Sequence, residues 1–201
     1  MLVAIHSENE AFNVLLCLDG VLKSFMTFGL QMAILSEKSI LVLHGAETAS
    51  SILLQQVVQV GCKVFTTAND IDEEQALQKF KNGIFHFYNT IFKMLFIVQI
   101  VNVNAPGWKS LERFTASETN DLGFDVIVDL TTSLPCAMWK PKKFEIINSL
   151  AAFGHWVTTE SNLEINPLES EVLLRKSASV SFSNIDTWLH SGYRQGLLLR
   201  K

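Results

Sequence analysis

The sequence has few of the residues that build disulfide or metal centres. Its three cysteines, Cys17, Cys62 and Cys136, lie far apart and form no C-x-x-C pair, which argues against a disulfide framework and a cysteine-based zinc site. The five histidines are equally dispersed, without metal-ligand spacing. We therefore expect reduced, partly buried thiols and no bound metal.

Positive charge is also scarce. The formal net charge is −4 and the pI is near 5.7, so the chain lacks the electrostatic footprint of a nucleic-acid-binding protein. The densest basic group (Lys140, Lys142 and Lys143) is small and typical of a solvated surface. The first residues lack the basic start and long apolar run of a signal peptide. These features predict a cytoplasmic protein with no nucleic-acid partner.

Several catalytic and phosphate-binding motifs are missing, among them a P-loop, a G-x-S-x-G elbow and a complete G-x-G-x-x-G fingerprint. What remains is an apolar run at residues 40–43, followed by a single glycine, Gly45, and then by helical periodicity. This pattern is typical of a buried parallel strand that turns into a helix. The N-terminus of such a helix presents backbone N–H groups to an anion, usually a dinucleotide's pyrophosphate. The plainer interpretation is an ordinary strand-to-helix turn with a helix cap.

Alternation of strands and helices gives the fold class. Apolar residues make up 48% of the 201 residues, and short continuous apolar runs are typical of strands buried on both faces of a parallel sheet. We predict an α/β protein with a Rossmann-type, doubly wound parallel sheet of about six strands. The predicted strands are 40–43, 62–66, 98–103, 124–129, 146–152 and 178–182, and the predicted helices are about 19–36, 50–60, 70–81 and 186–199. Pro167 rules out a continuous helix through residues 158–170.

An aromatic and aliphatic stretch at residues 83–97 interrupts this alternation. A membrane span needs about 18 or more nearly uncharged apolar residues, and here His86, Asn89 and Lys93 break the run. We expect an extra buried helix that leads into the strand at 98–103, and no membrane contact. A membrane-anchored segment at 84–103 is a distant alternative.

One run of residues is long and chemically unusual: Gly154-His155-Trp156-Val157-Thr158-Thr159-Glu160. Together with residues 40–55, 61–68, 123–129, 153–163 and 179–184, it resembles the quinone oxidoreductase-like (zeta-crystallin-like) proteins of the medium-chain dehydrogenase/reductase superfamily. The resemblance covers residues from about 19 to 201, with one gap.

The resemblance implies a domain organisation. Residues 1–36 would be an N-terminal segment with the connecting helix, and residues 37–201 the Rossmann-type nucleotide-binding domain, with a hydrophobic insertion at about 83–97. Nothing corresponds to the family's catalytic domain, and the crossover at 133–143 is short. We therefore expect a fragment, from a truncated gene model or a splice variant, with the insertion translated from non-coding sequence.

The resemblance also implies a nicotinamide cofactor. Gly45 and Ala46 would start the phosphate loop, in which Ser50 replaces the later glycine; its Cβ would crowd a phosphate, or its hydroxyl could donate a hydrogen bond or cap the helix. No acid follows the second strand directly, which favours NADPH over NADH. Asp70 is either the ribose-binding acid or, as we prefer, the next helix's N-cap. The expected cofactor-binding residues are Gly45, Ala46, Thr48, Ala49, Ser50, Ser51, Thr67, Asn69, Asp129, Leu130, Gly154 and His155.

The ends of the fourth and fifth strands should line the cofactor crevice. They nominate Asp129, Leu130 and Thr131, with Gly154, His155 and Trp156, of which Asp129, Leu130, Gly154 and His155 enter this set. His155 could act as an acid, but a histidine beside tryptophan is more often packed, so we predict no catalytic residue. The implied activity is NADPH-dependent hydride transfer to a quinone or enone in a homo-oligomer, with this chain alone inactive. The alternative is a non-catalytic nucleotide-binding or protein-interaction scaffold.

Overall fold

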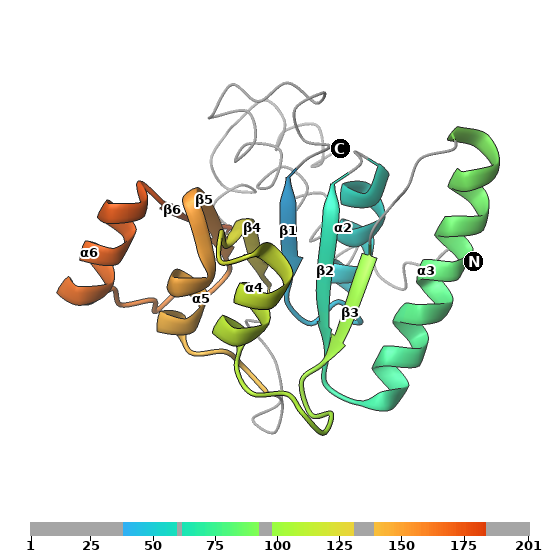
Figure 1. Cartoon of the computed structure of the whole chain (residues 1–201), viewed down its shortest axis with the longest axis horizontal. Coiled ribbons are helices and arrows are strands. Elements are labelled where there is room, and N and C mark those ends of the chain that lie inside the picture. The colour runs from blue at the N-terminus through green and yellow to red at the C-terminus, as the bar shows by residue number, and fades with distance from the viewer. Residues whose placement is uncertain (1–37, 60–61, 93–97, 131–138, 184–201) are drawn as a thin grey trace, which may run out of the picture.

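The computed structural model describes residues 38–59, 62–92, 98–130 and 139–183, which form a single parallel sheet with helices on both faces (Figure 1). The strands are β1 (Ser39–Val42), β2 (Lys63–Ala68), β3 (Val98–Asn102), β4 (Phe124–Asp129), β5 (Leu150–Thr158) and β6 (Ser179–Phe182). The helices are α2 (Thr48–Gln59), α3 (Ile71–Phe92), α4 (Leu111–Thr119), α5 (Lys143–Ser149) and α6 (Pro167–Lys176). The helices predicted at 19–36 and 186–199 lie outside the described residues.

The sheet has the order β3-β2-β1-β4-β5-β6, and every neighbouring pair is parallel. The chain therefore winds outward from β1 to β3, then crosses to the other side of β1 and winds outward again to β6. β1 and β4 flank the point where this direction reverses, and open sheets of this kind bind ligands at that point, beyond the strands' carboxyl ends. The predicted Rossmann-type fold class is confirmed.

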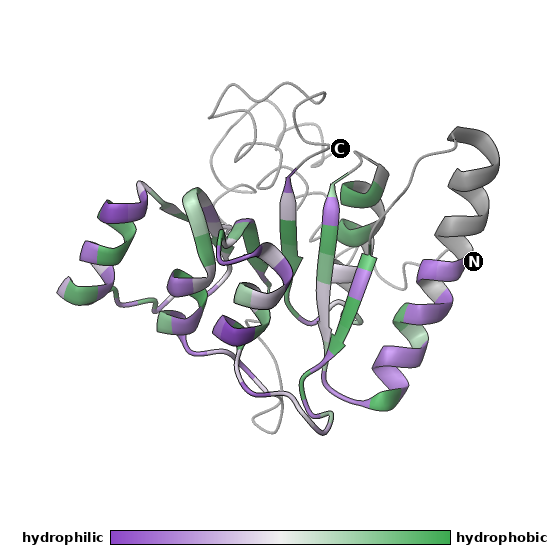
Figure 2. Ribbon diagram, viewed as in Figure 1, coloured by the Kyte–Doolittle hydropathy of each residue, from purple (hydrophilic) through white to green (hydrophobic). Residues whose placement is uncertain are grey.

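Two separate cores lie on the two faces of the sheet. α2 and α3 cover one face, where Leu53, Val57 and Leu77 pack with Ile40 and Val42. α4, α5 and α6 cover the other face, where Leu111, Ile146 and Val172 pack with Leu41. Ile40, Leu41 and Val42 have no exposed surface because they alternate between these two cores. Figure 2 shows the result: hydrophobic residues run along the central strands, whereas α4 and α6 carry both hydrophilic and hydrophobic residues.

The predicted strand at 146–152 is wrong at residues 146–149 and at its end. Residues Lys143–Ser149 form α5, and β5 begins only at Leu150. The Glu145 carboxylate accepts a 2.9 Å hydrogen bond from the Lys142 N–H at the start of α5, and the adjacent buried residues Ile146 and Ile147 face the core from this short helix. Consequently β5 ends at Thr158, six residues beyond the predicted end at residue 152.

The hydrophobic stretch at 83–97 continues α3, which runs to Phe92, well past the predicted end near residue 81. Residues 93–97 lie outside the described part, and β3 then begins at Val98 as predicted. Within the described residues, no helix is long and apolar enough to cross a membrane.

Besides α5, the helices α4 and α6 escaped prediction because their signals are local caps rather than long periodic patterns. Ser110 caps α4 by accepting a 3.3 Å hydrogen bond from the Arg113 N–H. Asn166 caps α6 by accepting a 2.9 Å hydrogen bond from the Glu169 N–H. Pro167 occupies the first position of α6, where its missing N–H removes no helical hydrogen bond. Proline thus starts this helix, in keeping with its exclusion from a helix interior.

We predict that Cys62 does not react with alkylating reagents in the folded protein. Its side chain is 2% exposed, and burial, aided by the charge of Asp125, raises its pKa to about 12. Because the thiolate is the reactive form, iodoacetamide at neutral pH should modify Cys62 only after denaturation, as peptide mass spectrometry would show. Labelling of the native protein at the rate of a free thiol would contradict the burial described here.

Candidate functional site

The turn after β1 approaches β2 so closely that only glycine fits at residue 45. The Gly45 N–H donates a 3.0 Å hydrogen bond to the Thr67 carbonyl. A Cβ added at Gly45 would lie 1.9 Å from Thr66 Oγ1 and 3.0 Å from Leu54 Cδ1 of α2. The glycine therefore lets the turn lie directly against β2 and α2, and close helix–strand packing is one of the roles that glycines have in nucleotide-binding turns.

Ser50 turns its hydroxyl inward. Its side chain is 1% exposed, and its Oγ donates a 3.2 Å hydrogen bond to the Leu43 carbonyl at the end of β1. Of the two predicted roles, the structure supports hydrogen-bond donation, and here the bond joins the first turn of α2 to the preceding strand. Ala46 is half-buried against the core, and the Ser51 N–H bonds to the Glu47 carbonyl at 2.8 Å. Thr48 and Ala49 are the first two residues of α2.

His44 is a central residue of this site that the sequence interpretation missed. Its φ angle of +52° is uncommon for a residue other than glycine. Its N–H donates a 2.8 Å hydrogen bond to Thr67 Oγ1, and its Nδ1 lies 3.0 Å from Asn69 Nδ2. Because an amide nitrogen only donates, Nδ1 accepts and the imidazole proton resides on Nε2. Burial lowers the His44 pKa, against the opposing charges of Asp129 and Glu73, so the ring is neutral at physiological pH.

Asn69, immediately after β2, binds a carboxylate from the next helix. Its N–H and its Nδ2 donate to Glu73 Oε2 at 2.7 and 3.1 Å. Its carbonyl accepts a 2.6 Å bond from Asn104 Nδ2, beyond β3. Asp70 Oδ1 accepts a 2.8 Å bond from the Glu73 N–H, so Asp70 is the N-cap of α3, as we preferred.

The end of β4 completes this edge of the sheet. Asp129 is 1% exposed, and its carbonyl accepts a 3.2 Å bond from the Thr159 N–H. Leu130 is half-buried against the core shared with α2. Thr131 lies outside the described residues. Gly45, Thr67, Asn69 and Asp129 thus lie at the carboxyl ends of three adjacent strands, as predicted. Within the described residues, no group of three His, Cys, Asp or Glu side chains is placed to hold a metal ion.

Gly154 and His155 are not at the strand end where we expected them. His155 pairs with Val126 of β4 and Ser179 of β6, three residues before β5 ends at Thr158. Its Nδ1 and Nε2 lie 2.5 and 2.8 Å from the hydroxyls of Ser179 and Ser181. Gly154 follows Phe153, whose φ is +60°. A Cβ added at Gly154 would lie 2.8 Å from the Ala151 carbonyl oxygen. The error follows from the misplaced end of β5, and His155 is a packed residue, as its sequence context suggested.

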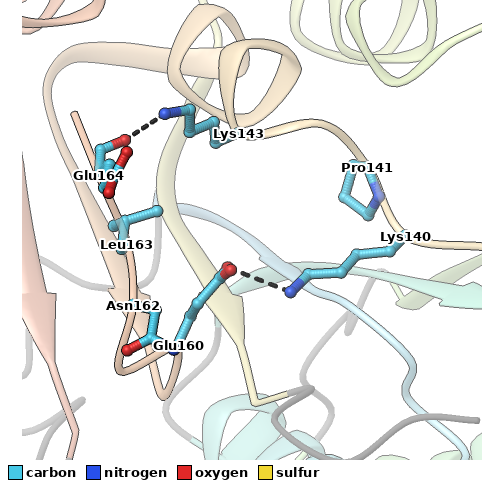
Figure 3. Close-up of a pocket in the computed structure, with 7 residues that line it drawn as sticks. All are labelled: Lys140, Pro141, Lys143, Glu160, Asn162, Leu163 and Glu164. Atoms are coloured by element: carbon cyan, nitrogen blue, oxygen red, sulfur yellow. Dashed lines mark hydrogen bonds and ion pairs between the residues drawn. The ribbon is translucent and has the colours of Figure 1, made fainter. Parts of the chain in front are cut away.

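A surface hollow of about 330 Å³ lies just after β5 (Figure 3). Lys140 bonds to Glu160 at 3.1 Å on one side, and Lys143 bonds to the Glu164 carbonyl on the other. Lys143 also lies 3.2 Å from Glu169 Oε2. None of the predicted cofactor-binding residues lines this hollow, and because its cations are already paired it is no ready anion site.

We predict that Gly45→Ala lowers the free energy of unfolding by about 1–3 kcal/mol, the usual cost of overpacking. The added methyl would overlap Thr66 Oγ1. Urea denaturation of the Gly45→Ala, Thr66→Ala and double variants would measure this. If the overlap is the cause, the double variant loses less than the sum of the single losses; strictly additive losses would show that it is not.

A second prediction concerns acid stability. Burial lowers the pKa of His155 below its ordinary 6.5. As the pH falls through 6.5 the unfolded chain gains a proton that the folded chain does not, so this residue's share of stability is present above pH 6.5 and is lost below it. His155→Gln should therefore show a smaller fall in Tm between about pH 7.5 and 5.5 than the unmodified protein.

The matched control for this measurement is Ser181→Ala, which removes a partner of the His155 ring but keeps the titrating group. It should lower Tm at both pH values and keep the pH dependence. An unchanged pH dependence in His155→Gln would contradict the assignment.

No family model matches the sequence. The chain is 30% identical to mouse (Mus musculus) quinone oxidoreductase-like protein 1 over 169 residues, which span 81% of this chain and 44% of that protein. The chain thus corresponds to less than half the length of this relative.

Solved structures agree on the fold. The structure of a 2-haloacrylate reductase superposes with a TM-score of 0.58 at 13% identity, over 90% of this chain and 49% of that one. An alcohol dehydrogenase superfamily protein from Novosphingobium aromaticivorans gives 0.56 at 18% identity, over 82% and 41%. A Pseudomonas syringae quinone oxidoreductase gives 0.53 at 12% identity, over 76% and 40%. At these identities the likeness establishes the fold alone.

The sequence relative and the fold agree with the resemblance seen in residues 40–55 and 153–163. The predicted resemblance is confirmed: over 81% of its length the chain is similar to part of quinone oxidoreductase-like protein 1, and it shares its fold with an alcohol dehydrogenase superfamily protein and a quinone oxidoreductase.

Proposed function

We propose that the carboxyl edge of the sheet binds a nicotinamide dinucleotide. We further propose that this chain is the nucleotide-binding part of a quinone oxidoreductase-like protein, which uses the cofactor to reduce a quinone or enone. The relation to quinone oxidoreductase-like protein 1 supports this proposal, as do fold neighbours named as a quinone oxidoreductase and an NAD-dependent alcohol dehydrogenase. When bound, the cofactor would supply the hydride, and the residues of this chain would hold and orient it.

The observation that carries the proposal is the turn at Gly45. Its backbone approaches β2 so closely that a methyl group does not fit between them, and α2 begins shortly after it, at Thr48. The first N–H groups of any helix lack partners within the helix, and the first turn of α2 contains no acidic residue. Glu47, which precedes α2, is exposed. The positive end of this helix is therefore suited to a pyrophosphate.

Ser50 is compatible with pyrophosphate binding at the start of α2. Its hydroxyl bonds to the Leu43 carbonyl between α2 and β1, so its side chain does not extend from the turn toward a ligand. The proposed phosphate loop consists of Gly45, Ala46, Thr48, Ala49 and Ser51. Thr67 and Asn69 would border it at β2, and Asp129 and Leu130 at β4. Gly154 and His155 are left out, because they lie before the end of β5.

We predict that NADH or NADPH raises the melting temperature of the purified chain. A ligand that binds only the folded state stabilises it by RT ln(1 + [L]/Kd), about 2.7 kcal/mol at a hundredfold excess over Kd. Thermal unfolding with each nucleotide, and with adenosine as a control that lacks the pyrophosphate, would measure this effect. No shift with either nucleotide at millimolar concentration would refute nucleotide binding and leave the non-catalytic scaffold as the better function.

A further inference from the structure

The second strand of the sheet ends beside a carboxylate that the sequence does not place there. Residues Thr66 to Asn69 include no acid, but Glu73 returns from the first turn of α3 to accept two hydrogen bonds from Asn69. The Glu73 side chain is part of a network that continues through Asn69 Nδ2 to His44 Nδ1. Three residues from β1, β2 and α3 are thus joined at one point on the carboxyl edge.

This network contains two buried polar atoms whose hydrogen-bonding capacity is unused. His44 is 1% exposed and Asn69 is 6% exposed. Among the described residues, His44 Nε2 and Asn69 Oδ1 have no hydrogen-bond partner. Buried polar groups in folded proteins nearly always have partners, so this pair points to a polar ligand that supplies one.

The chemistry of the two atoms defines the ligand. Nδ1 of His44 accepts from Asn69, so Nε2 carries the proton and is a donor, whereas Asn69 Oδ1 is an acceptor. The half-buried Glu73 carboxylate adds further acceptor sites. A pair of hydroxyl groups, which both donate and accept, satisfies such a set.

We propose that Glu73, positioned by Asn69 and His44, binds the adenosine ribose of the dinucleotide through its free 2′-hydroxyl and thereby selects NADH over NADPH. The inference rests on the proposed function, and it replaces the preference for NADPH that follows from the sequence alone. Glu73 is the group that contacts the ribose, and Asn69 and His44 are positioning residues.

The charges around Glu73 oppose a 2′-phosphate. Asp70 caps α3, and Asp72 and Glu74 neighbour Glu73 in its first turn, so a phosphate bound at Glu73 would be close to several like charges. Lys140 is near enough to lower the pKa of His44, but its ammonium is bonded to Glu160. A 2′-phosphate would need a free cation or a cluster of donors here, whereas a hydroxyl needs only an acceptor.

Binding measurements with NADH and NADPH test the selection without any assay of turnover. Isothermal titration of the whole chain should give a Kd for NADH roughly tenfold or more below that for NADPH, since a hydrogen bond to a charged group is worth about that factor. Glu73→Gln keeps the shape but removes the charge, and it should reduce this ratio about tenfold. The control is Glu74→Gln, because Glu74 Oε2 bonds to Asn102 instead; its ratio should match that of the unmodified chain.

The outcomes separate the two proposals. If neither nucleotide binds, the proposed function fails, and the selection fails with it. If NADPH binds as tightly as NADH or tighter, the proposed function stands and the selection by Glu73 is overturned. An unchanged ratio in Glu73→Gln also overturns it, and circular dichroism of that variant would establish that it is folded. The ratio of the two Kd values in the unmodified chain tests the selection even if the variant does not fold.

Discussion

The end of β2 holds the turn after β1 through three hydrogen bonds, and the candidate site depends on them. Thr66 Oγ1 donates to the Val42 carbonyl, while the Thr67 carbonyl and hydroxyl accept from the Gly45 and His44 N–H groups. These bonds satisfy backbone groups that the irregular turn would otherwise bury without partners. They also fix where α2 starts and which way His44 faces. A β2 strand with valines at these two positions would keep the core and the bond to the residue 67 carbonyl, but it would lose the two bonds made by the threonine hydroxyls.

The architecture could be predicted because it follows from continuous apolar runs. Buried strands such as β1 and β4 need apolar side chains on both faces, and this pattern is visible in the sequence. The region around Ile146 could not be assigned in the same way. A helix of seven residues with two adjacent buried isoleucines has no measurable period, so an apolar run there fits helix or strand. That single ambiguity misplaced the end of β5 and, with it, Gly154 and His155.

The site was predictable where it depends on position along a strand and unpredictable where it depends on tertiary contact. Asn69 and Asp129 follow β2 and end β4, so strand ends locate them. Glu73 carries a sequence signal too, since Asp70 and Glu73 have the spacing of a capping box. In that motif the glutamate bonds back to the N-cap N–H, but here it bonds to Asn69, one residue earlier. His44 has no such signal, because its left-handed backbone is imposed by the contacts with Thr67.

The two helices at the carboxyl edge differ in charge, and this difference would place the two parts of the proposed dinucleotide at separate positions. The first turn of α2 has no acidic residue, whereas that of α3 has Asp72, Glu73 and Glu74. A helix N-terminus attracts anions through its dipole. At α3, the acidic residues of its own first turn already interact with this dipole. The pyrophosphate is therefore best stabilised at α2, and the neighbouring end of β2 is left to an uncharged group rich in hydroxyls. An adenosine ribose joined to a pyrophosphate has both groups: hydroxyls for the end of β2 and an anion for the start of α2.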